Sequence, residues 1–389
     1  MLFRSPIAHS HRFNRCAQEF STEAQSCDRL RRTPASLGDM PIPRAASAEL
    51  RLVRPAPEVP ATRSASLPLE ARREFGALLP LLDRPEIRDI LIQVSSGVAQ
   101  LWVDTGESLR HLARWQAPPE AIRRLAVGLI AAGGRHLDEL HPMANVRLGE
   151  GIRVHAVLAP IAVAGATISI RLPRLHPLGF DELVRAGLAT PAQERWLRRA
   201  VAERKNLLIT GGTGSGKTTV LAALLELVPH TERIVTIEDV AELQVRHPHR
   251  VALETREANT EGAGEISLEL LLREALRMRP DRLVLGECRG AEAVTLLAAL
   301  NTGHDGGAGT LHANRLLDVP ARLEALGMLA GLGPEPLGRQ AMAAIHGVVH
   351  LERSPVGLHR ITAIGSFELH AGALGIRDSP GSGAPAGGP

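Results

Sequence analysis

The chain has 389 residues, of which 44% are apolar and 22% charged, a composition that predicts a folded protein of two or three domains. Aromatic residues make up only 2%, which counts against binding of single-stranded nucleic acid through base stacking. The net charge of +3 is uneven: residues 1–73 hold 12 arginines and 7 acidic residues, so +5, and the rest carries −2. Residues 74–389, the body of the chain, are thus nearly neutral. They are poorly suited to binding duplex DNA, because affinity for DNA grows with the number of phosphates that the protein neutralises.

The cysteines and the apolar stretches give no sign of a secreted or membrane-spanning protein. Cys16, Cys27 and Cys288 form no C-x-x-C pair, so neither a disulfide framework nor a zinc site is expected. The most apolar stretch, 154–170, is shorter than the roughly 20 residues of a membrane span and is interrupted by Pro160. We expect a pair of strands there, no transmembrane segment, and membrane attachment only through a partner.

The first half of the chain divides into a leader and a small domain. Residues 1–66 mix Arg, Ser, Pro and Ala without sustained periodicity and are expected to be a disordered basic leader. Met40 is a second candidate start of translation, which would make residues 1–39 an over-extended gene start. Short strand and helix patterns over 67–173 predict an α+β domain, and residues 174–179 are expected to link it to the second domain.

Residues 180–372 alternate strand and helix patterns, which predicts a mostly parallel sheet covered by helices. The expected strands are 207–210, 233–237, 251–254, 282–285, 310–312, 348–353 and 358–364. The expected helices are 181–186, 191–202, 268–278, 291–301, 319–329 and 336–345. Residues 373–389 are rich in Gly, Pro, Ser and Ala and are expected to form a disordered tail.

A glycine-rich motif, GGTGSGKTT, follows the apolar run 207–210 and precedes a segment of helical composition. Strand, glycine loop and helix together form the context of a phosphate-binding loop, where backbone N–H groups and the helix N-terminus face phosphate oxygens. Lys217 would reach the β- and γ-phosphates, and the Thr218 hydroxyl would hold Mg²⁺. The expected nucleotide-binding residues of the loop are Gly211, Gly212, Thr213, Gly214, Ser215, Gly216, Lys217, Thr218 and Thr219.

Lysine usage supports this interpretation over a chance glycine-rich turn. Of the 45 lysines and arginines, only Lys205 and Lys217 are lysines. A compact ammonium and a broad planar guanidinium are not interchangeable inside a backbone cradle. A lysine at this one motif position in an arginine-rich chain therefore favours binding of a nucleoside triphosphate.

Two predicted strands of this domain end in carboxylates. Glu238 and Asp239 follow one strand, and Glu287 follows another, with Gly286 where a magnesium-coordinating Asp is usual. Ligands of open α/β sheets bind at the carboxyl ends of the strands, where Mg²⁺ and an attacking water need oxygen acceptors. We expect Glu238 and Glu287 to face the terminal phosphate as such acceptors.

The segment 301–314, NTGHDGGAGTLHAN, places His304 and His312 in a glycine-rich loop and the strand that follows. Their spacing is not that of zinc ligands, and Cys288 supplies no partner motif. A sensor of the γ-phosphate is the favoured functional interpretation, because an imidazole can report phosphate occupancy. The alternative for each histidine is a packed or surface residue.

These four motifs together resemble the type II/type IV secretion ATPase superfamily, within the RecA-like P-loop proteins. The resemblance extends over about 85–351, and 81–92 and 255–287 are similar to the Tad/Flp pilus-assembly branch, especially its actinobacterial members. The tetracysteine zinc module of some type II secretion ATPases is absent from the sequence. The implied fold class is α/β, a RecA-like P-loop ATPase core with a smaller N-terminal α+β domain.

The resemblance also implies a function: a homo-hexameric cytoplasmic ATPase that uses ATP and Mg²⁺ at the inner face of the cell membrane. It would work with inner-membrane platform proteins of a pilus or secretion system, and no direct contact with nucleic acid is expected. Glu287 carries over as the residue that holds Mg²⁺, directly or through water, or polarises the attacking water. Glu238 carries over as its acidic rival, and His304 and His312 as the histidine-box residues.

Family members place basic residues on the phosphates, and the nucleotide lies between the two domains. The arginines in the corresponding regions are Arg153, Arg171, Arg174, Arg256 and Arg289. Because the RecA-like core is shared, the alternative functions are a DNA translocase or conjugative-transfer ATPase, and a nucleotide-gated scaffold that does not hydrolyse ATP.

Overall fold

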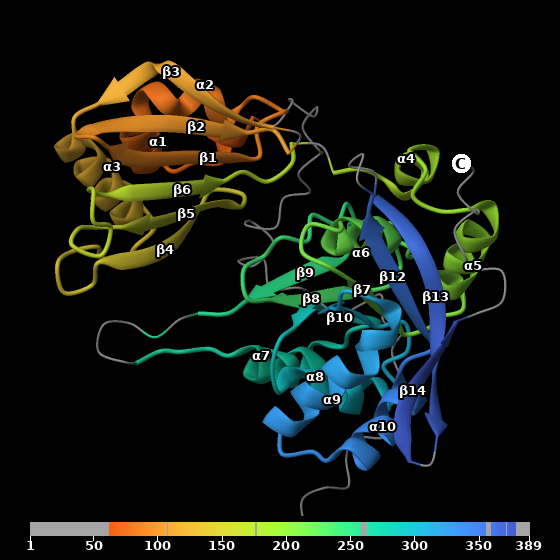
Figure 1. Cartoon of the computed structure of the whole chain (residues 1–389). Helices are drawn as coiled ribbons and strands as arrows, with labels where there is room; N and C mark the ends of the chain where they lie inside the picture. Colours follow the sequence, from red (N-terminus) through yellow and green to blue (C-terminus); the bar gives the residue numbers. More distant parts are fainter. Residues whose placement is uncertain are drawn as a thin grey trace, which may run out of the picture. The chain divides into compact units, whose positions relative to one another are not determined.

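The structure is a computed structural model, and it describes residues 62–378 except 107, 176, 257, 259–262, 355–358 and 371 (Figure 1). The described strands form two sheets, one of six strands and one of eight. The leader up to residue 61, with both candidate translation starts, lies outside the described residues, and so do residues 379–389.

The six-stranded sheet is antiparallel throughout, in the order β3-β2-β1-β6-β5-β4. Its strands are β1 (Asp89–Ser95), β2 (Val98–Asp104), β3 (Leu109–Ala117), β4 (Met143–Leu148), β5 (Ile152–Val157) and β6 (Thr167–Arg171). Buried and accessible positions alternate along β1, so that Ile90, Ile92 and Val94 all point to one face. That alternation is typical of a sheet with one face on a core and one face toward water.

Helices cover the buried face of this sheet. α1 (Leu69–Phe75) and α3 (Pro119–Ala132) contribute Phe75 and Leu129 to the same core as β1. Residues 69–82 form three short helices in succession: α1, η2 (Gly76–Leu78) and α2 (Leu79–Leu82). Gly76 has φ of 44°, a backbone conformation that ends α1 and that glycine adopts at little cost.

The apolar stretch 154–170 forms the expected strand pair. β5 and β6 pair antiparallel, with Val157 opposite Thr167, and the turn between them contains Pro160 and Gly165. The edge strand β4, in which Ala144, Val146 and Leu148 are buried and alternate with exposed residues, is not among the predicted strands.

The predicted disordered leader is wrong for its last residues, 63–66, which form the short helix η1 (Arg63–Ser66). Arg63 is 6% exposed, and its guanidinium donates to the carbonyls of Leu82, Arg84 and Pro173 at 2.6–2.8 Å. A cluster of backbone acceptors brought together by folding therefore orders this arginine, and composition alone cannot reveal such a cluster.

The eight-stranded sheet has the order β14-β13-β12-β7-β11-β10-β8-β9. The strands are β7 (Leu207–Gly211), β8 (Ile234–Glu238), β9 (Arg250–Glu254), β10 (Arg282–Cys288), β11 (Ala308–His312), β12 (Gly347–Arg353), β13 (His359–His370) and β14 (Ala373–Asp378). Neighbours from β12 to β9 are parallel, and β13 and β14 are added antiparallel at one side.

Helices cover both faces of this sheet, and Figure 1 shows the two groups on opposite sides. One group is α4 (Phe180–Arg185), α5 (Pro191–Ala202) and α6 (Lys217–Leu225); the other is α7 (Leu268–Ala275), α8 (Glu292–Leu300), α9 (Val319–Leu329) and α10 (Pro334–Ala344). Leu208 packs on the second group, whereas Leu207 and Ile209 pack on the first. Burial on both faces explains why β7 is continuously apolar, without alternation.

The predicted disordered tail, 373–389, is wrong for residues 373–378, because these form β14. Leu374 and Ile376 alternate along the strand and are buried in the core beside α10. Gly372, with φ of 87°, makes the tight turn from β13. The glycine-rich composition concealed this short alternating pattern.

Candidate functional site

The phosphate loop connects the carboxyl end of β7 to the first residue of α6. Gly214 and Gly216 have φ of 71° and 91°, the left-handed region that favours glycine. A Cβ on Gly211 would lie 2.4 Å from the carbonyl oxygen of Leu351, so the neighbouring strand also requires a glycine here. The first N–H groups of α6 have no partner within the helix, and this loop leads directly to them.

Lys217 folds back over this loop. Its Nζ donates to the carbonyls of Gly211 and Gly212, both at 2.9 Å. Burial lowers the pKa of Lys217, the carboxylate of Glu287 opposes that effect, and Arg289 adds to it. The ammonium is therefore held among the loop carbonyls and lies within electrostatic reach of Glu287.

His312 stands at the carboxyl end of β11, opposite Gly211 of β7 in the sheet register. Its Nε2 lies 2.6 Å from the Thr213 hydroxyl, so the imidazole contacts the phosphate loop directly. Burial lowers the pKa of His312, and the positive charge of Lys217 adds to the effect. A neutral imidazole hydrogen-bonded to the loop is in a position to sense what the loop holds.

His304, the other histidine predicted as a γ-phosphate sensor, lies away from the phosphate loop. It precedes β11, and its Nδ1 is 3.2 Å from the carbonyl of Ala299 at the end of α8. β11 runs from Ala308 to His312 between the two histidines, a distance of about 13 Å. The two histidines are close in sequence, but the strand between them carries them to opposite edges of the sheet.

Glu287 is presented by an irregularity in β10. Leu285 pairs with Gly309 and Cys288 with Leu311, so β10 has one residue more than β11 over this stretch, as in a β-bulge. Leu285 and Cys288 are buried, whereas the side chain of Glu287 is 29% exposed. The bulge thus turns this carboxylate out of the core at the edge where the phosphate loop lies.

Arg289 is shared by the two acidic strand ends. Its Nη2 lies 2.6 Å from Glu287 Oε2, and its Nη1 lies 3.4 Å from Asp239 Oδ2. Burial raises the pKa of Asp239, and the charge of Arg289 opposes the rise. The sequence placed Asp239 at a strand end without a role, and the structure adds it to the group around Glu287.

Glu238 occupies a different environment from Glu287. It is 4% exposed, and its Oε1 accepts hydrogen bonds from the backbone N–H groups of Glu242 and Leu243 at 2.9 and 3.0 Å. A Cβ on Gly286 would lie 2.5 Å from Glu238 Cγ, so the glycine in place of the usual Asp makes room for this side chain. Burial raises the pKa of Glu238, although the two backbone donors act in the opposite direction.

A cleft of about 580 Å³ extends from the first turn of α6 to β5 and β6. Thr218 and Thr219 line one wall of it, and several arginines line the other walls. This volume lies within the range of roughly 300–1,000 Å³ that is usual for small-molecule sites. The cleft is therefore large enough for a nucleotide whose phosphates reach the loop.

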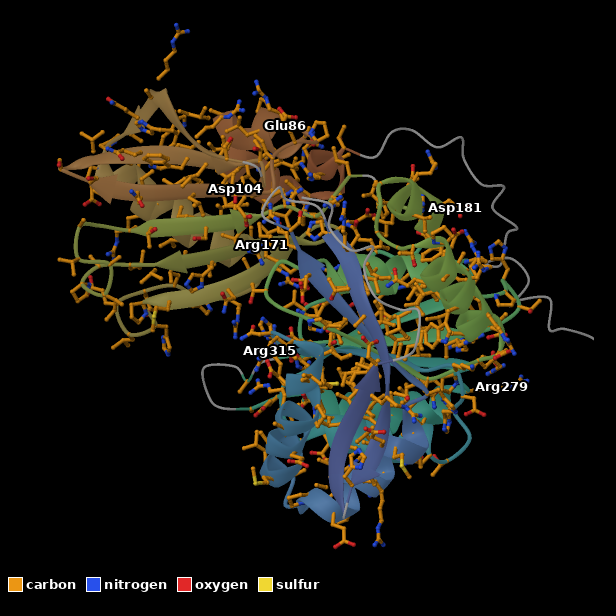
Figure 2. The ribbon with its side chains drawn as sticks, turned by 45° about the vertical axis from the view of Figure 1, so that its right-hand side comes forward. Glu86, Asp104, Arg171, Asp181, Arg279 and Arg315 are labelled. Carbon is orange, nitrogen blue, oxygen red and sulfur yellow. The ribbon has the colours of Figure 1, made fainter. Side chains whose placement is uncertain are left out.

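The structure brings Arg153 and Arg171 to this cleft, where they are opposite one another on β5 and β6. Arg153 forms an ion pair with Glu242 at 2.5 Å and donates to the carbonyl of Val240 at 2.9 Å. Arg171 forms an ion pair with Asp89 at 3.0 Å. The hydrogen bond to Asp89 raises the pKa of Arg171, and the negative charge of Asp104, labelled with Arg171 in Figure 2, adds to the rise.

Two more arginines line the cleft. Burial lowers the pKa of Arg174, and the neighbouring Arg88 lowers it further. Arg250, which no sequence signal singled out, has its Nε buried with no hydrogen-bond partner among the described residues. Arg256 is not among the residues that line the cleft, and its Nε donates to the carbonyl of Gly264.

The donor set at this edge of the sheet fits magnesium bound together with a nucleotide. The described part of the chain contains no group of three or more His, Cys, Asp or Glu side chains that could hold a metal by themselves. Mg²⁺ usually takes one or two protein oxygens and completes its shell with phosphates and water. Thr218 on the cleft wall and Glu287 near the carboxyl end of β10 carry such oxygens.

Comparisons with known proteins agree with this site. Residues 94–355 match the family described as Type II/IV secretion system protein. A putative conjugal transfer protein of Mycobacterium tuberculosis is 47% identical over 295 residues, which cover 74% of this chain and 83% of that protein. The probable conjugal transfer protein TrbB of Sinorhizobium fredii is 37% identical over 243 residues, 61% of this chain and 71% of that protein.

Solved structures show the same fold. The ATPase DotB of Legionella pneumophila is 20% identical, with a TM-score of 0.51 over 79% of this chain and 82% of that one. The pilus retraction motor PilT, solved with bound ADP, is 24% identical, with a TM-score of 0.52 over 74% of this chain and 80% of that one. This likeness confirms the predicted α/β fold with a RecA-like P-loop core.

None of the helices in the described ranges combines the length and apolar character that crossing a bilayer demands. The phosphate loop, the partly exposed Glu287 beside it and the family match over 94–355 lead to one conclusion. The chain belongs to the type II/IV secretion system protein family and is one of its ATPases.

Proposed function

We propose that this ATPase hydrolyses Mg²⁺-bound ATP to drive assembly of a Tad/Flp-type pilus or a related type II/IV secretion process. The observation that carries the chemical part is the meeting of Lys217, His312 and Glu287 at the carboxyl edge of one sheet. The similarity of residues 81–92 and 255–287 to the Tad/Flp branch supports the choice of pilus assembly. The solved PilT, a pilus retraction motor, has the same fold.

The residues of the loop would bind the triphosphate. Its backbone N–H groups and the ammonium of Lys217 face the β- and γ-phosphates, and Thr218 holds Mg²⁺. Bound Mg²⁺ would neutralise charge on the phosphate oxygens. From the facing wall, Arg153 and Arg171 supply guanidinium groups, which bind phosphate through paired hydrogen bonds.

Glu287 is the better candidate for orienting and deprotonating the attacking water, because its carboxylate is partly exposed and close to Lys217. Glu238, whose oxygens already accept two backbone hydrogen bonds, would instead shape the loop that carries Asp239. His312 would report occupancy of the γ-phosphate position to the loop through Thr213.

Arg153 would also couple nucleotide binding to movement of the six-stranded sheet. In the structure it is paired with Glu242 and Val240 of the eight-stranded sheet's domain. A triphosphate in the cleft would compete for this guanidinium. We further propose a homo-hexameric ring at the cytoplasmic face of the inner membrane, held there by platform proteins of the secretion system.

The second candidate function is conjugative DNA transfer, which the names of two relatives favour: both are described as conjugal transfer proteins. The nearly neutral body of the chain outside its leader argues against direct contact with DNA. An ATPase rate that rises with added DNA, and loses this stimulation steeply with salt, would favour the second function over pilus assembly.

The largest predicted effect of any single change is that of Lys217→Ala, which we expect to abolish ATP turnover by removing the only cation inside the phosphate loop. The chain offers one matched control, Lys205→Ala. Lys205 precedes β7 and pairs with Glu203 on the surface, so its loss should leave turnover unchanged. The rate of phosphate release from ATP measures turnover in both variants. Turnover that survives in Lys217→Ala would refute the assignment of the site.

A further inference from the structure

The strand β13 begins beside the phosphate loop, at His359. The Nδ1 of His359 lies 2.9 Å from the carbonyl oxygen of Ser215, a residue 144 positions earlier in the chain. The same nitrogen would be 3.2 Å from a Cβ placed on Gly216. Because a carbonyl oxygen only accepts, Nδ1 carries the proton and donates this hydrogen bond.

The strand before it, β12, holds the start of the same loop. His350 is 1% exposed, pairs with Thr210 in the sheet register, and has its Nδ1 2.9 Å from the Thr210 hydroxyl. The carbonyl of Leu351 lies against Gly211. The β12–β13 hairpin therefore contacts the phosphate loop at both ends, where the chain enters it and where it leaves.

The hydrogen bond from His359 to the Ser215 carbonyl also fixes the direction of the next backbone N–H group. The Ser215 carbonyl and the Gly216 N–H belong to one planar trans peptide, so they point in opposite directions. A donor that holds the carbonyl toward β13 therefore keeps the Gly216 N–H pointing away from β13. In a phosphate loop that N–H is one of the donors that bind the nucleotide.

We propose that His359 is a positioning residue for the nucleotide: it fixes the Ser215–Gly216 peptide so that the Gly216 N–H faces the phosphates. The inference rests on ATP binding at this loop and adds a residue outside the four sequence motifs. Burial lowers the pKa of His359, and the charges of Arg353, Arg174 and Arg88 act in the same direction. A neutral imidazole is thus the donor.

Three substitutions test the position of the donor. Asparagine carries an N–H donor close to the place of Nδ1, whereas glutamine carries it farther out, close to Nε2. For His359→Ala we expect about a five- to tenfold weaker affinity for a fluorescent ADP analogue and a similar rise in KM for ATP, with kcat little changed. His359→Asn should recover to within about twofold of the unaltered protein, and His359→Gln should remain as weak as the alanine variant.

The matched control is His370→Ala, at the other end of β13, where the exposed imidazole pairs with Glu368. It should change neither KM nor ADP affinity. Equal ADP affinity in His359→Ala and the unaltered protein would overturn the inference. Equal recovery by Asn and Gln would overturn it too, since any polar side chain would then suffice. If a loss of folding follows His359→Ala, the comparison of Asn with Gln still decides. Failure of the unaltered protein to bind ADP would overturn the ATP site itself.

Discussion

The carboxyl ends of β8 and β10 lie side by side in the eight-stranded sheet, and each carries a glutamate. Glu238 at the end of β8 is 4% exposed and accepts two backbone hydrogen bonds, whereas Glu287 at the bulge of β10 is 29% exposed and pairs with Arg289. Two residues of one type at one edge therefore have different surroundings. The buried carboxylate binds two N–H groups of the following loop, and the other one remains accessible.

The two strand ends also depend on each other. Ile237 is paired with Leu285, which places Gly286 next to Glu238. The glycine leaves the space into which the Glu238 side chain packs. Gly286 in place of the usual Asp therefore leaves room for the Glu238 side chain to fold inward, so that of the two glutamates only Glu287 remains accessible.

Neutralising each carboxylate in turn tests whether the two glutamates have different roles. For Glu287→Gln we expect kcat to fall by about 10²–10⁴-fold, because the general base is lost. The side chain keeps its shape, so ADP affinity and the unfolding midpoint should change little. Saturating-ATP turnover, a titration with ADP and a thermal melt measure the three quantities.

Glu238→Gln, assayed in parallel, is the matched control for the same change of charge at the neighbouring strand end. We expect it to reduce kcat by less than Glu287→Gln does. If the order of the two losses were reversed, Glu238 would be the base and the contrast in exposure would have misled us.

The second prediction concerns the space between the two strand ends. In Gly286→Ala, the added Cβ would lie 2.5 Å from Glu238 Cγ, so we expect the free energy of unfolding to fall by about 1–3 kcal/mol. The same change should cost much less in a Glu238→Ala background, where the conflicting side chain is absent. Urea unfolding of the four proteins in this cycle tests the coupling, and strictly additive losses would contradict it.

Sequence reasoning located the parts of the site that depend on short-range pattern. Lys217, Thr218 and Gly216 were predicted because strand, loop and helix follow one another directly in the chain. The strand ends at Glu238 and Glu287 were predicted for the same reason, since an apolar run followed by an acid marks the edge of a parallel sheet.

What sequence reasoning missed depends on neighbours that only folding brings together. His304 and His312 look like one motif, but β11 separates them. The difference between Glu238 and Glu287 comes from a bulge and a glycine on another strand. His359 meets Ser215 across 144 residues, and a lone histidine at the start of a strand carries no signal of such a contact.

The smallest expected effect concerns pH and tests the environment of Glu238 alone. Burial raises the pKa of Glu238 in the folded protein, so the native state binds this proton more tightly than the unfolded chain. The stabilisation that protonated Glu238 gives to the fold is then fully present below the ordinary glutamate pKa. It is lost as the pH rises through the pKa that Glu238 has in the folded protein. The unfolding free energy of the natural protein relative to Glu238→Gln should therefore fall as the pH is raised from about 4 to 8.

Urea unfolding of both proteins at several pH values measures this difference, and Glu335→Gln supplies the same substitution at an exposed position on α10. Subtracting the change in unfolding free energy caused by Glu335→Gln at each pH removes the general effect of one fewer negative charge. A difference that grew with pH would show that the two backbone donors outweigh burial and that the ionised carboxylate stabilises the fold. Glu238 would then be a charged residue at the edge of the site, and its contrast with Glu287 would be one of hydrogen bonding and not of desolvation.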